Sequence, residues 1–221
     1  MNGATRCELG REPYCNMYMK TISTGLLDSN CYIIGDKNSA VVIDAGADHA
    51  EVLQILESQH LSLEYIVLTH AHIDHVLNVG KLRDAAGARV VIHEDDAPLL
   101  GDPVLNCSAL FGLNKVFGPA DILVKDGDSI NVGGINLQFI HTPGHTPGSI
   151  CVLAGNELFS GDTLFRLGVG RTDLGAGSVQ KLEASLGRLM ELDDSIIVYP
   201  GHGPATNIGY ERRNNPLAGD Y

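Results

Sequence analysis

The chain has 221 residues and a formal net charge of −12 at pH 7. A chain of this length forms one large or two small domains and buries roughly 70% of its unfolded surface. Because nucleic acids and anionic membranes attract clustered Lys and Arg, the acidic balance argues against either as a partner. The five cysteines are scattered and form no Cys-x-x-Cys pair, which excludes a disulfide framework and a zinc ribbon.

Residues 1–16 show no clear hydrophobic period, and we expect them to form an N-terminal arm before a single domain at 17–221. They lack the continuous apolar stretch of a signal peptide, and the sequence holds no apolar run long enough to span a bilayer. We find no internal repeat and no linker. We therefore expect a cytoplasmic protein without a membrane partner.

The first periodic stretches are strand-like and separated by turn-forming residues. Strands are predicted over Tyr18–Thr21, Asn30–Ile34 and Ala40–Ile43. A helix is predicted over Asp48–Ser58, with Asp48 as its N-cap and apolar residues at helical spacing. The fold is therefore expected to begin with a β-meander followed by a packing helix.

Residues 68–75, Leu-Thr-His-Ala-His-Ile-Asp-His, have an unusual density of imidazole and carboxylate groups. They follow the apolar, β-branched strand predicted at 66–68, and a helix is expected after them, to about Ala86. Open α/β sheets bind ligands at the carboxyl ends of their strands. Imidazole nitrogens and carboxylate oxygens suit zinc, iron or manganese. The run therefore predicts metal ligands: His70, His72, Asp74 and His75.

A short strand is predicted over Arg89–Ile92, and His93 opens the acidic turn after it. We expect His93 to cap the start of a helix rather than to bind metal. The stretch 101–120 has Pro, Gly and scattered apolar residues without a sustained period. Such a segment is typical either of a substrate-binding loop or of a surface loop with an apolar underside.

Three further strands, Ile122–Lys125, Ser129–Val132 and Ile135–Ile140, lead to a second histidine-rich loop. Its sequence is His-Thr-Pro-Gly-His-Thr-Pro-Gly, in which Pro and Gly fix tight turns. We expect His145, between the two turns, to be a metal ligand. His141, at the strand end, is expected to form a local hydrogen bond.

In the last part of the chain, Ser-Gly-Asp162 ends another strand, and Pro-Gly-His202-Gly-Pro follows the strand predicted at Ser195–Tyr199. The stretch Asn207–Asn215 is expected to form one or two helical turns. Between these strands, Ser178–Glu191 is the best amphipathic helix, capped by its serine. Its predicted apolar face consists of Val179, Leu182, Leu186, Leu189 and Met190.

Taken together, the motifs Thr-His-Ala-His-Ile-Asp-His, Thr-Pro-Gly-His, Ser-Gly-Asp and Pro-Gly-His-Gly-Pro resemble those of the metallo-β-lactamase superfamily. The resemblance implies an α+β fold, a four-layer αββα sandwich with the site along one edge of its two sheets. It also implies two divalent metal ions, zinc first, with iron or manganese compatible. The implied ligands are His70, His72 and His145 for one ion, Asp74, His75 and His202 for the other, and Asp162 bridging both.

The implied nucleophile is a hydroxide between the two ions, because metal binding lowers the pKa of water from about 15.7 toward 7. No Ser or Cys nucleophile is then needed, and the resemblance marks Asp74 as a catalytic residue as well as a ligand. From Gly161 onward the chain resembles small, single-domain type II glyoxalase-like hydrolases. These are similar to hydroxyacylglutathione hydrolases, which cleave S-lactoylglutathione. The resemblance thus implies a small-molecule thioester as substrate.

Two-domain glyoxalase II enzymes have a helical carboxyl-terminal region that helps to hold glutathione, whereas only 19 residues follow His202 here. Thioester hydrolysis remains the expectation, and the identity of the thiol carrier stays open.

The main alternative is a persulfide dioxygenase, which the Gly-Arg-Thr-Asp segment at 170–173 also resembles. Such an enzyme uses one iron, here held by His70 or His72 with His145 and Asp162, and would leave the second set of ligands without a function. Arg171 either contacts the substrate or forms a structural ion pair with Asp173.

A lactonase or another ester hydrolase is a weaker expectation. Enzymes with β-lactamase activity typically place a cysteine among the second-metal ligands, where this chain has Asp162, which argues against antibiotic hydrolysis.

Overall fold

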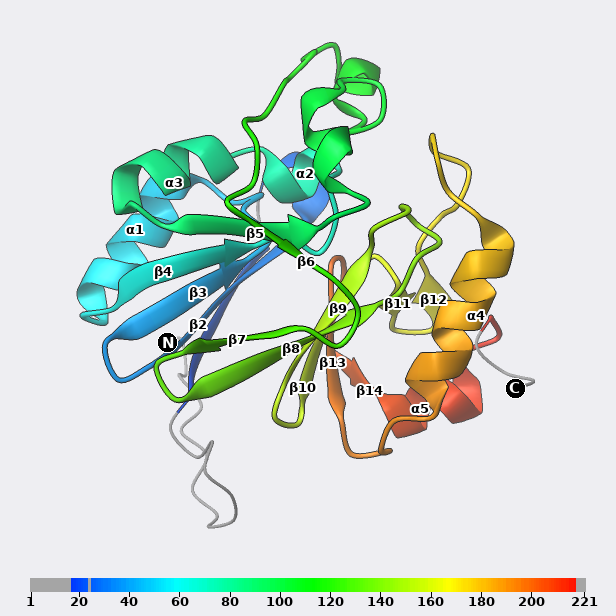
Figure 1. Cartoon of the computed structure of the whole chain (residues 1–221). Coiled ribbons are helices and arrows are strands. Elements are labelled where there is room, and N and C mark those ends of the chain that lie inside the picture. The colour runs from blue at the N-terminus through cyan, green and yellow to red at the C-terminus, as the bar shows by residue number, and fades with distance from the viewer. Residues whose placement is uncertain (1–16, 24, 218–221) are drawn as a thin grey trace.

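Two six-stranded β-sheets pack face to face in the computed structural model, which describes residues 17–23 and 25–217 (Figure 1). Helices cover the outer face of each sheet, so the layers are helix, sheet, sheet and helix. The expected αββα sandwich is therefore confirmed. The arm predicted at 1–16 lies outside the described residues.

The first sheet has the strand order β1-β2-β3-β4-β5-β6. Its strands are β1 (Tyr18–Ser23), β2 (Asn30–Asp36), β3 (Ser39–Ile43), β4 (Ser62–Val67), β5 (Arg89–His93) and β6 (Ile122–Val124). The first three strands are antiparallel neighbours, whereas β3 to β6 run parallel. The carboxyl ends of the parallel strands therefore meet at one edge of the sheet.

The second sheet has the order β14-β13-β10-β9-β8-β7. Its strands are β7 (Ser129–Val132), β8 (Ile135–His141), β9 (Ile150–Ala154), β10 (Glu157–Gly161), β13 (Ile197–Pro200) and β14 (Thr206–Asn207). Strands β10 and β13 are parallel, and the other neighbours are antiparallel. A separate two-stranded ribbon joins β11 (Leu164–Phe165) to β12 (Gly168–Val169). Of these, β9, β11, β12 and β14 were not predicted from the sequence.

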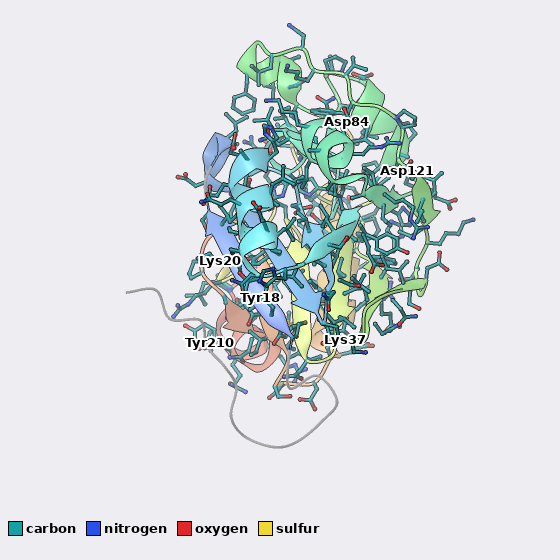
Figure 2. The ribbon with its side chains drawn as sticks, turned by 90° about the vertical axis from the view of Figure 1, so that its left-hand side faces the viewer. Tyr18, Lys20, Lys37, Asp84, Asp121 and Tyr210 are labelled. Carbon is teal, nitrogen blue, oxygen red and sulfur yellow. The ribbon has the colours of Figure 1, made fainter. Side chains whose placement is uncertain are left out.

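On the first sheet lie α1 (His49–Ser58) and α3 (Val79–Ala86), preceded by the short α2 (Ile73–Val76). Figure 2 shows this side of the molecule, with Tyr18 and Lys20 on β1. On the second sheet lie α4 (Val179–Met190) and α5 (Ile208–Asn214) (Figure 1). Three short 3-10 turns complete the elements: η1 (Leu26–Asp28), η2 (Ala97–Gly101) and η3 (Ser108–Phe111). None of the helices within the described residues is long and apolar enough to cross a membrane.

Each sheet has apolar residues on both faces, because each is covered on both sides. Along β3, Val41 and Ile43 pack between the sheets, whereas Ala40 and Val42 pack against the helices. Successive strand residues point to opposite faces, so a doubly covered strand is apolar throughout. This explains why the predicted strands showed continuous apolar runs.

The helix caps agree with the sequence. Asp48 accepts hydrogen bonds from two backbone N–H groups of α1, Ser178 accepts one from Lys181 N, and Asn207 accepts one from Tyr210 N. Two predictions need correction. The helix expected after residue 75 is divided into α2 and α3, and Val179 is 52% exposed rather than part of the apolar face of α4, because this first helical residue lies where the chain enters the helix.

One buried and one exposed apolar residue of α4 provide a test. Leu186 is fully buried in the layer between α4 and the second sheet, so Leu186→Ala should lower the free energy of unfolding by about 3 kcal/mol. Val179 is exposed, so Val179→Ala should change the free energy of unfolding by less than about 0.5 kcal/mol. Urea denaturation of both variants, each loaded with the same metal, measures this difference. Equal effects of the two substitutions would contradict the packing described here.

Candidate metal centre

The seven polar residues singled out in the sequence come together at one edge of the two sheets. The first sheet supplies the loop after β4 and the start of α2, and the second sheet supplies the ends of β8, β10 and β13 (Figure 1). The residues are His70, His72, Asp74, His75, His145, Asp162 and His202. Apart from Asp162 and His202, all are buried.

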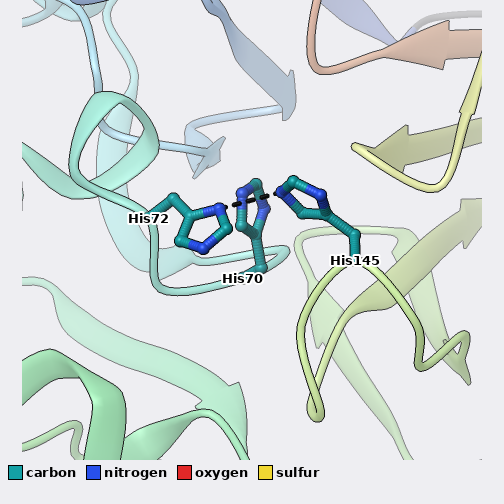
Figure 3. A group of neighbouring side chains, drawn as sticks. All are labelled: His70, His72 and His145. Atoms are coloured by element: carbon teal, nitrogen blue, oxygen red, sulfur yellow. Dashed lines mark hydrogen bonds between the residues drawn. The ribbon is translucent and has the colours of Figure 1, made fainter. Parts of the chain in front are cut away.

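The first group consists of His70, His72 and His145, whose ring nitrogens approach within 4.8 Å of one another. The closest pair is His72 Nδ1 and His145 Nε2, 2.8 Å apart (Figure 3). His70 Nε2 is buried and has no hydrogen-bond partner among the described residues. A buried polar atom without a partner is costly. A metal ion among these three nitrogens would satisfy it.

The second group consists of Asp74, His75 and His202. Asp74 Oδ2 lies 3.1 Å from His202 Nε2 and 3.2 Å from His75 Nε2, and these two nitrogens are 3.3 Å apart. One carboxylate oxygen and two imidazole nitrogens are a donor set that fits zinc, iron or manganese. The group can therefore hold a second ion.

Asp162 lies between the two groups. Its Oδ1 is 3.4 Å from His75 Nε2, and its Oδ2 is 3.5 Å from His145 Nε2 and 3.7 Å from His202 Nε2. Oδ1 is buried and has no hydrogen-bond partner among the residues described. The carboxylate thus occupies the position that a ligand shared by two ions needs.

Hydrogen bonds at the far side of three imidazole rings fix which nitrogen faces the centre. His145 Nδ1 donates to the backbone oxygen of Arg171 at 2.7 Å, and His75 Nδ1 lies 2.8 Å from Asp44 Oδ2. His70 Nδ1 lies 3.1 Å from the hydroxyl of Thr69, which itself donates to Asp44 Oδ2. With Nδ1 as the donor, Nε2 is the nitrogen of each ring that faces the centre and can bind a metal.

Burial and nearby charges give the histidines of the two groups different protonation states. Burial lowers the pKa of His72 to about 3, and burial together with His75 lowers the pKa of His70 well below its usual value. These two rings are neutral at physiological pH. Burial alone would lower the pKa of His75 and His202, but the carboxylates of Asp74 and Asp162 outweigh it and raise both pKa values. The second group therefore retains protons that a metal must displace.

Asp74 is ionised in this environment. Burial favours its neutral form, but the charge of His75 and the hydrogen bond from His202 outweigh that effect and hold its pKa well below the usual range. The side chain also lines the pocket described below. It therefore carries a negative charge beside the substrate space.

Asp44 is a functional residue that the sequence analysis missed. It follows β3, and its buried carboxylate accepts hydrogen bonds from Thr69 N at 2.8 Å and Thr69 Oγ1 at 2.7 Å in addition to its contact with His75. Ligand-bearing imidazoles commonly have such a carboxylate behind them. The signal was present in the sequence, because Asp44 follows an apolar strand as the predicted ligands do.

Asp96 is the second residue missed, and it joins the two histidine-bearing loops. Its carboxylate accepts hydrogen bonds from Ala71 N, Thr146 Oγ1 and Gly148 N at 2.6–2.9 Å. Ala71 lies between His70 and His72, and Thr146 follows His145. Asp96 therefore sets the separation of the loops that carry the first group.

His93 does not cap a helix, contrary to the prediction. Its Nδ1 accepts a hydrogen bond from Asp95 N at 3.2 Å, and its ring stacks on His141 with centroids 3.9 Å apart. The following 3-10 turn begins at Ala97 without a side-chain cap. His141 donates to Pro147 O, which confirms its expected local hydrogen bond.

A pocket of about 360 Å³ opens over the two groups. Cys107, Leu110 and Phe111 from the irregular stretch 101–120 form part of its wall, as expected of a substrate-binding loop. Arg171 also lines it, but its guanidinium forms a two-bond ion pair with Asp173. Both roles left open for Arg171 therefore remain compatible with its position.

Gly201 allows the His202 loop to approach the centre closely. A Cβ atom there would lie 2.1 Å from Asp162 Oδ1 and 2.8 Å from His75 Cε1.

We expect Gly201→Ala to displace both groups and to reduce bound metal to one ion per chain or fewer, as measured by elemental analysis. Gly80→Ala is the matched control, because no atom lies within 4 Å of its added Cβ. Unchanged metal content in Gly201→Ala would contradict this expectation, because it would show that the loop can move away without loss of metal.

The protonation states predict a pH-dependent order of metal loading. Protons compete with metal for the second group, because the pKa values of His75 and His202 are raised, whereas His70 and His72 are already neutral. Equilibrium dialysis at one fixed, low concentration of free zinc should therefore give fewer ions per chain at about pH 6 than at about pH 8. Full loading of both groups at the lower pH would contradict this order.

Comparison with known proteins identifies the fold family. The model of the metallo-beta-lactamase superfamily matches residues 24–202. Among curated relatives, an uncharacterized protein of Mycobacterium tuberculosis is 39% identical, over 91% of this chain and 97% of its own. The hydroxyacylglutathione hydrolase GloC of Haemophilus influenzae is 33% identical, over 91% of this chain and 98% of its own.

Solved structures give the same fold. The B3 metallo-beta-lactamase BLEG-1 superposes with a TM-score of 0.86 at 37% identity, covering 90% of this chain and 99% of that one. The di-iron-bound form of TTHA1623 gives 0.80 at 36%, with the same coverage. ETHE1 from Myxococcus xanthus gives 0.76 at 33%, covering 90% and 83%. By its sequence, its fold and the arrangement of its His and Asp side chains, the chain belongs to the metallo-beta-lactamase superfamily.

Proposed function

We propose that this protein, a metal-dependent hydrolase by family, holds two metal ions and hydrolyses thioesters of the hydroxyacylglutathione type. The observation that carries the proposal is the second donor group, Asp74, His75 and His202, beside the first, with Asp162 between them. The similarity to hydroxyacylglutathione hydrolase GloC supports the thioester as substrate.

Metal ions held by these groups would supply an activated water and polarise the substrate carbonyl. The residues of the chain prepare the centre for this chemistry. Asp44 orients the rings of His70 and His75 through Thr69 and by direct contact. Asp74 is ionised and faces the pocket, so it accepts a hydrogen bond from a water molecule and thereby orients it. An ionised carboxylate has no proton to give, so the sulfur that leaves when the C–S bond breaks takes its proton from the attacking water or from solvent.

A covalent intermediate on the protein is not required. Cys107 lines the pocket, but burial and the nearby charge of Asp74 raise its pKa. Its sulfur is therefore a thiol at neutral pH, and a thiol is a poor nucleophile compared with a thiolate. This supports hydrolysis by activated water.

Two other activities are specific enough to test. The persulfide dioxygenase alternative rests on the resemblance of the Gly-Arg-Thr-Asp segment at 170–173, and it uses one iron held by His70 or His72 with His145 and Asp162. The similarity to a B3 metallo-beta-lactamase favours hydrolysis of a β-lactam amide. The first alternative predicts one metal and oxygen consumption, whereas the second predicts the same two-metal centre acting on another carbonyl.

A parallel assay separates these activities. Purified protein should contain two metal ions per chain and release thiol from S-lactoylglutathione, and it should neither consume oxygen with glutathione persulfide nor open a chromogenic cephalosporin at a comparable rate. One iron per chain with oxygen uptake would replace the proposal by the dioxygenase, and β-lactam opening without thiol release would replace it by a β-lactamase.

His202→Ala tests the catalytic need for the second group. Because it removes one of three donors in that group, we expect about one metal ion per chain and a loss of kcat/KM of about 100-fold or more. His60→Asn is the control, since His60 is exposed and its φ of 55° suits asparagine. Full activity with one bound ion would contradict the two-metal proposal.

A further inference from the structure

The walls of the pocket are mainly apolar above the polar floor. The apolar side chains come from η1, from the stretch around η3 and from the segment 164–174, and together they surround the His and Asp groups. They are Leu27, Leu110, Phe111, Phe165, Val169 and Leu174. Pockets with apolar walls and a few polar groups are typical of small-molecule sites.

Three of these side chains remain exposed to solvent. Leu27 is 58%, Leu110 67% and Phe111 40% exposed. Exposed apolar groups that gather around one cavity mark a ligand-binding surface rather than a packing defect. A ligand that covers them gains hydrophobic free energy in proportion to the area removed from water.

The charged residues of the pocket indicate which part of a thioester contacts the apolar wall. Among the described residues that line the pocket, Arg171 is the only Lys or Arg, and Asp173 already pairs with its guanidinium through two hydrogen bonds. The two carboxylates of a glutathione carrier therefore find no free cation among the described residues of this wall. They remain hydrated when the carrier extends to solvent, which leaves the apolar wall to the acyl group.

We propose that the apolar wall selects thioesters by their acyl group and prefers an apolar substituent larger than methyl, such as phenyl or branched alkyl. Phe111 and Leu110 are the specificity-determining residues. This inference rests on the thioester hydrolysis proposed above. It adds that the acyl side, rather than the thiol carrier, is recognised by the protein.

The preference has an expected size. One added methylene in an apolar pocket changes kcat/KM by about 10-fold or more. S-mandeloylglutathione and S-lactoylglutathione have the same carrier and the same hydroxyl group and differ in phenyl against methyl. We expect kcat/KM, divided by the rate constant for hydrolysis by hydroxide ion, to be about 10-fold or more higher for the mandeloyl thioester.

Substitutions on the wall should change this ratio. Phe111→Ala and Leu110→Ala are expected to lower kcat/KM for S-mandeloylglutathione about 10-fold more than kcat/KM for S-lactoylglutathione. Val104→Ala is the matched control, because Val104 belongs to the same irregular segment and is 69% exposed but does not line the pocket. It should leave both substrates unchanged.

The outcomes separate the two proposals. Thiol release from both thioesters at equal corrected rates would overturn the acyl preference and leave thioester hydrolysis standing. Equal losses for both substrates in Phe111→Ala, with metal content unchanged, would assign Phe111 a structural role and likewise overturn it. Absence of thiol release from either thioester by the metal-loaded protein would remove the thioester hydrolase proposal, and the inference with it.

Discussion

The structure depends on the cost of burying ionisable groups where its two sheets meet. Imidazoles and carboxylates lose hydration there, so each must find a partner. Asp44 reduces this cost by accepting two hydrogen bonds from Thr69 while contacting His75, and Asp96 does so by accepting three. Two buried atoms of the centre, His70 Nε2 and Asp162 Oδ1, have no hydrogen-bond partner among the described residues, and they lie where metal ions can supply one. Stability and chemistry therefore impose the same arrangement.

Much of the centre could be predicted because strand ends are visible in sequence. An apolar run followed at once by His or Asp predicts a side chain at the edge of a sheet, and parallel strands bring such edges together. His70, Asp162 and His202 were found by that pattern, although hundreds of ångströms of extended chain would separate the first from the last. His145 was predicted from its place between two glycine-containing turns after a strand. Asp44 also follows an apolar strand. It was not predicted as part of the centre, because a single aspartate before Ala-Gly also fits a turn.

Other features depend on tertiary contacts that no local pattern contains. The partners of Asp96 are 25 to 52 residues away in sequence, so its short acidic turn gave no sign of its role. Strand β9 was missed because it directly follows the turn-rich loop that ends at Ser149. The exposure of Val179 depends on where the chain enters α4, not on helical spacing. Periodicity thus predicted the elements well, and their contacts poorly.

The donors are shared between the halves of the sandwich. The loop after β4 and the helix α2 of the first half carry His70 to His75, while strands of the second half lead to His145, Asp162 and His202. An ion held by residues from both halves acts as a cross-link, and binding that requires the folded state adds to folding free energy. Metal supply would then govern how long the folded chain survives in the cell. Scarcity would remove the protein itself, and its activity with it.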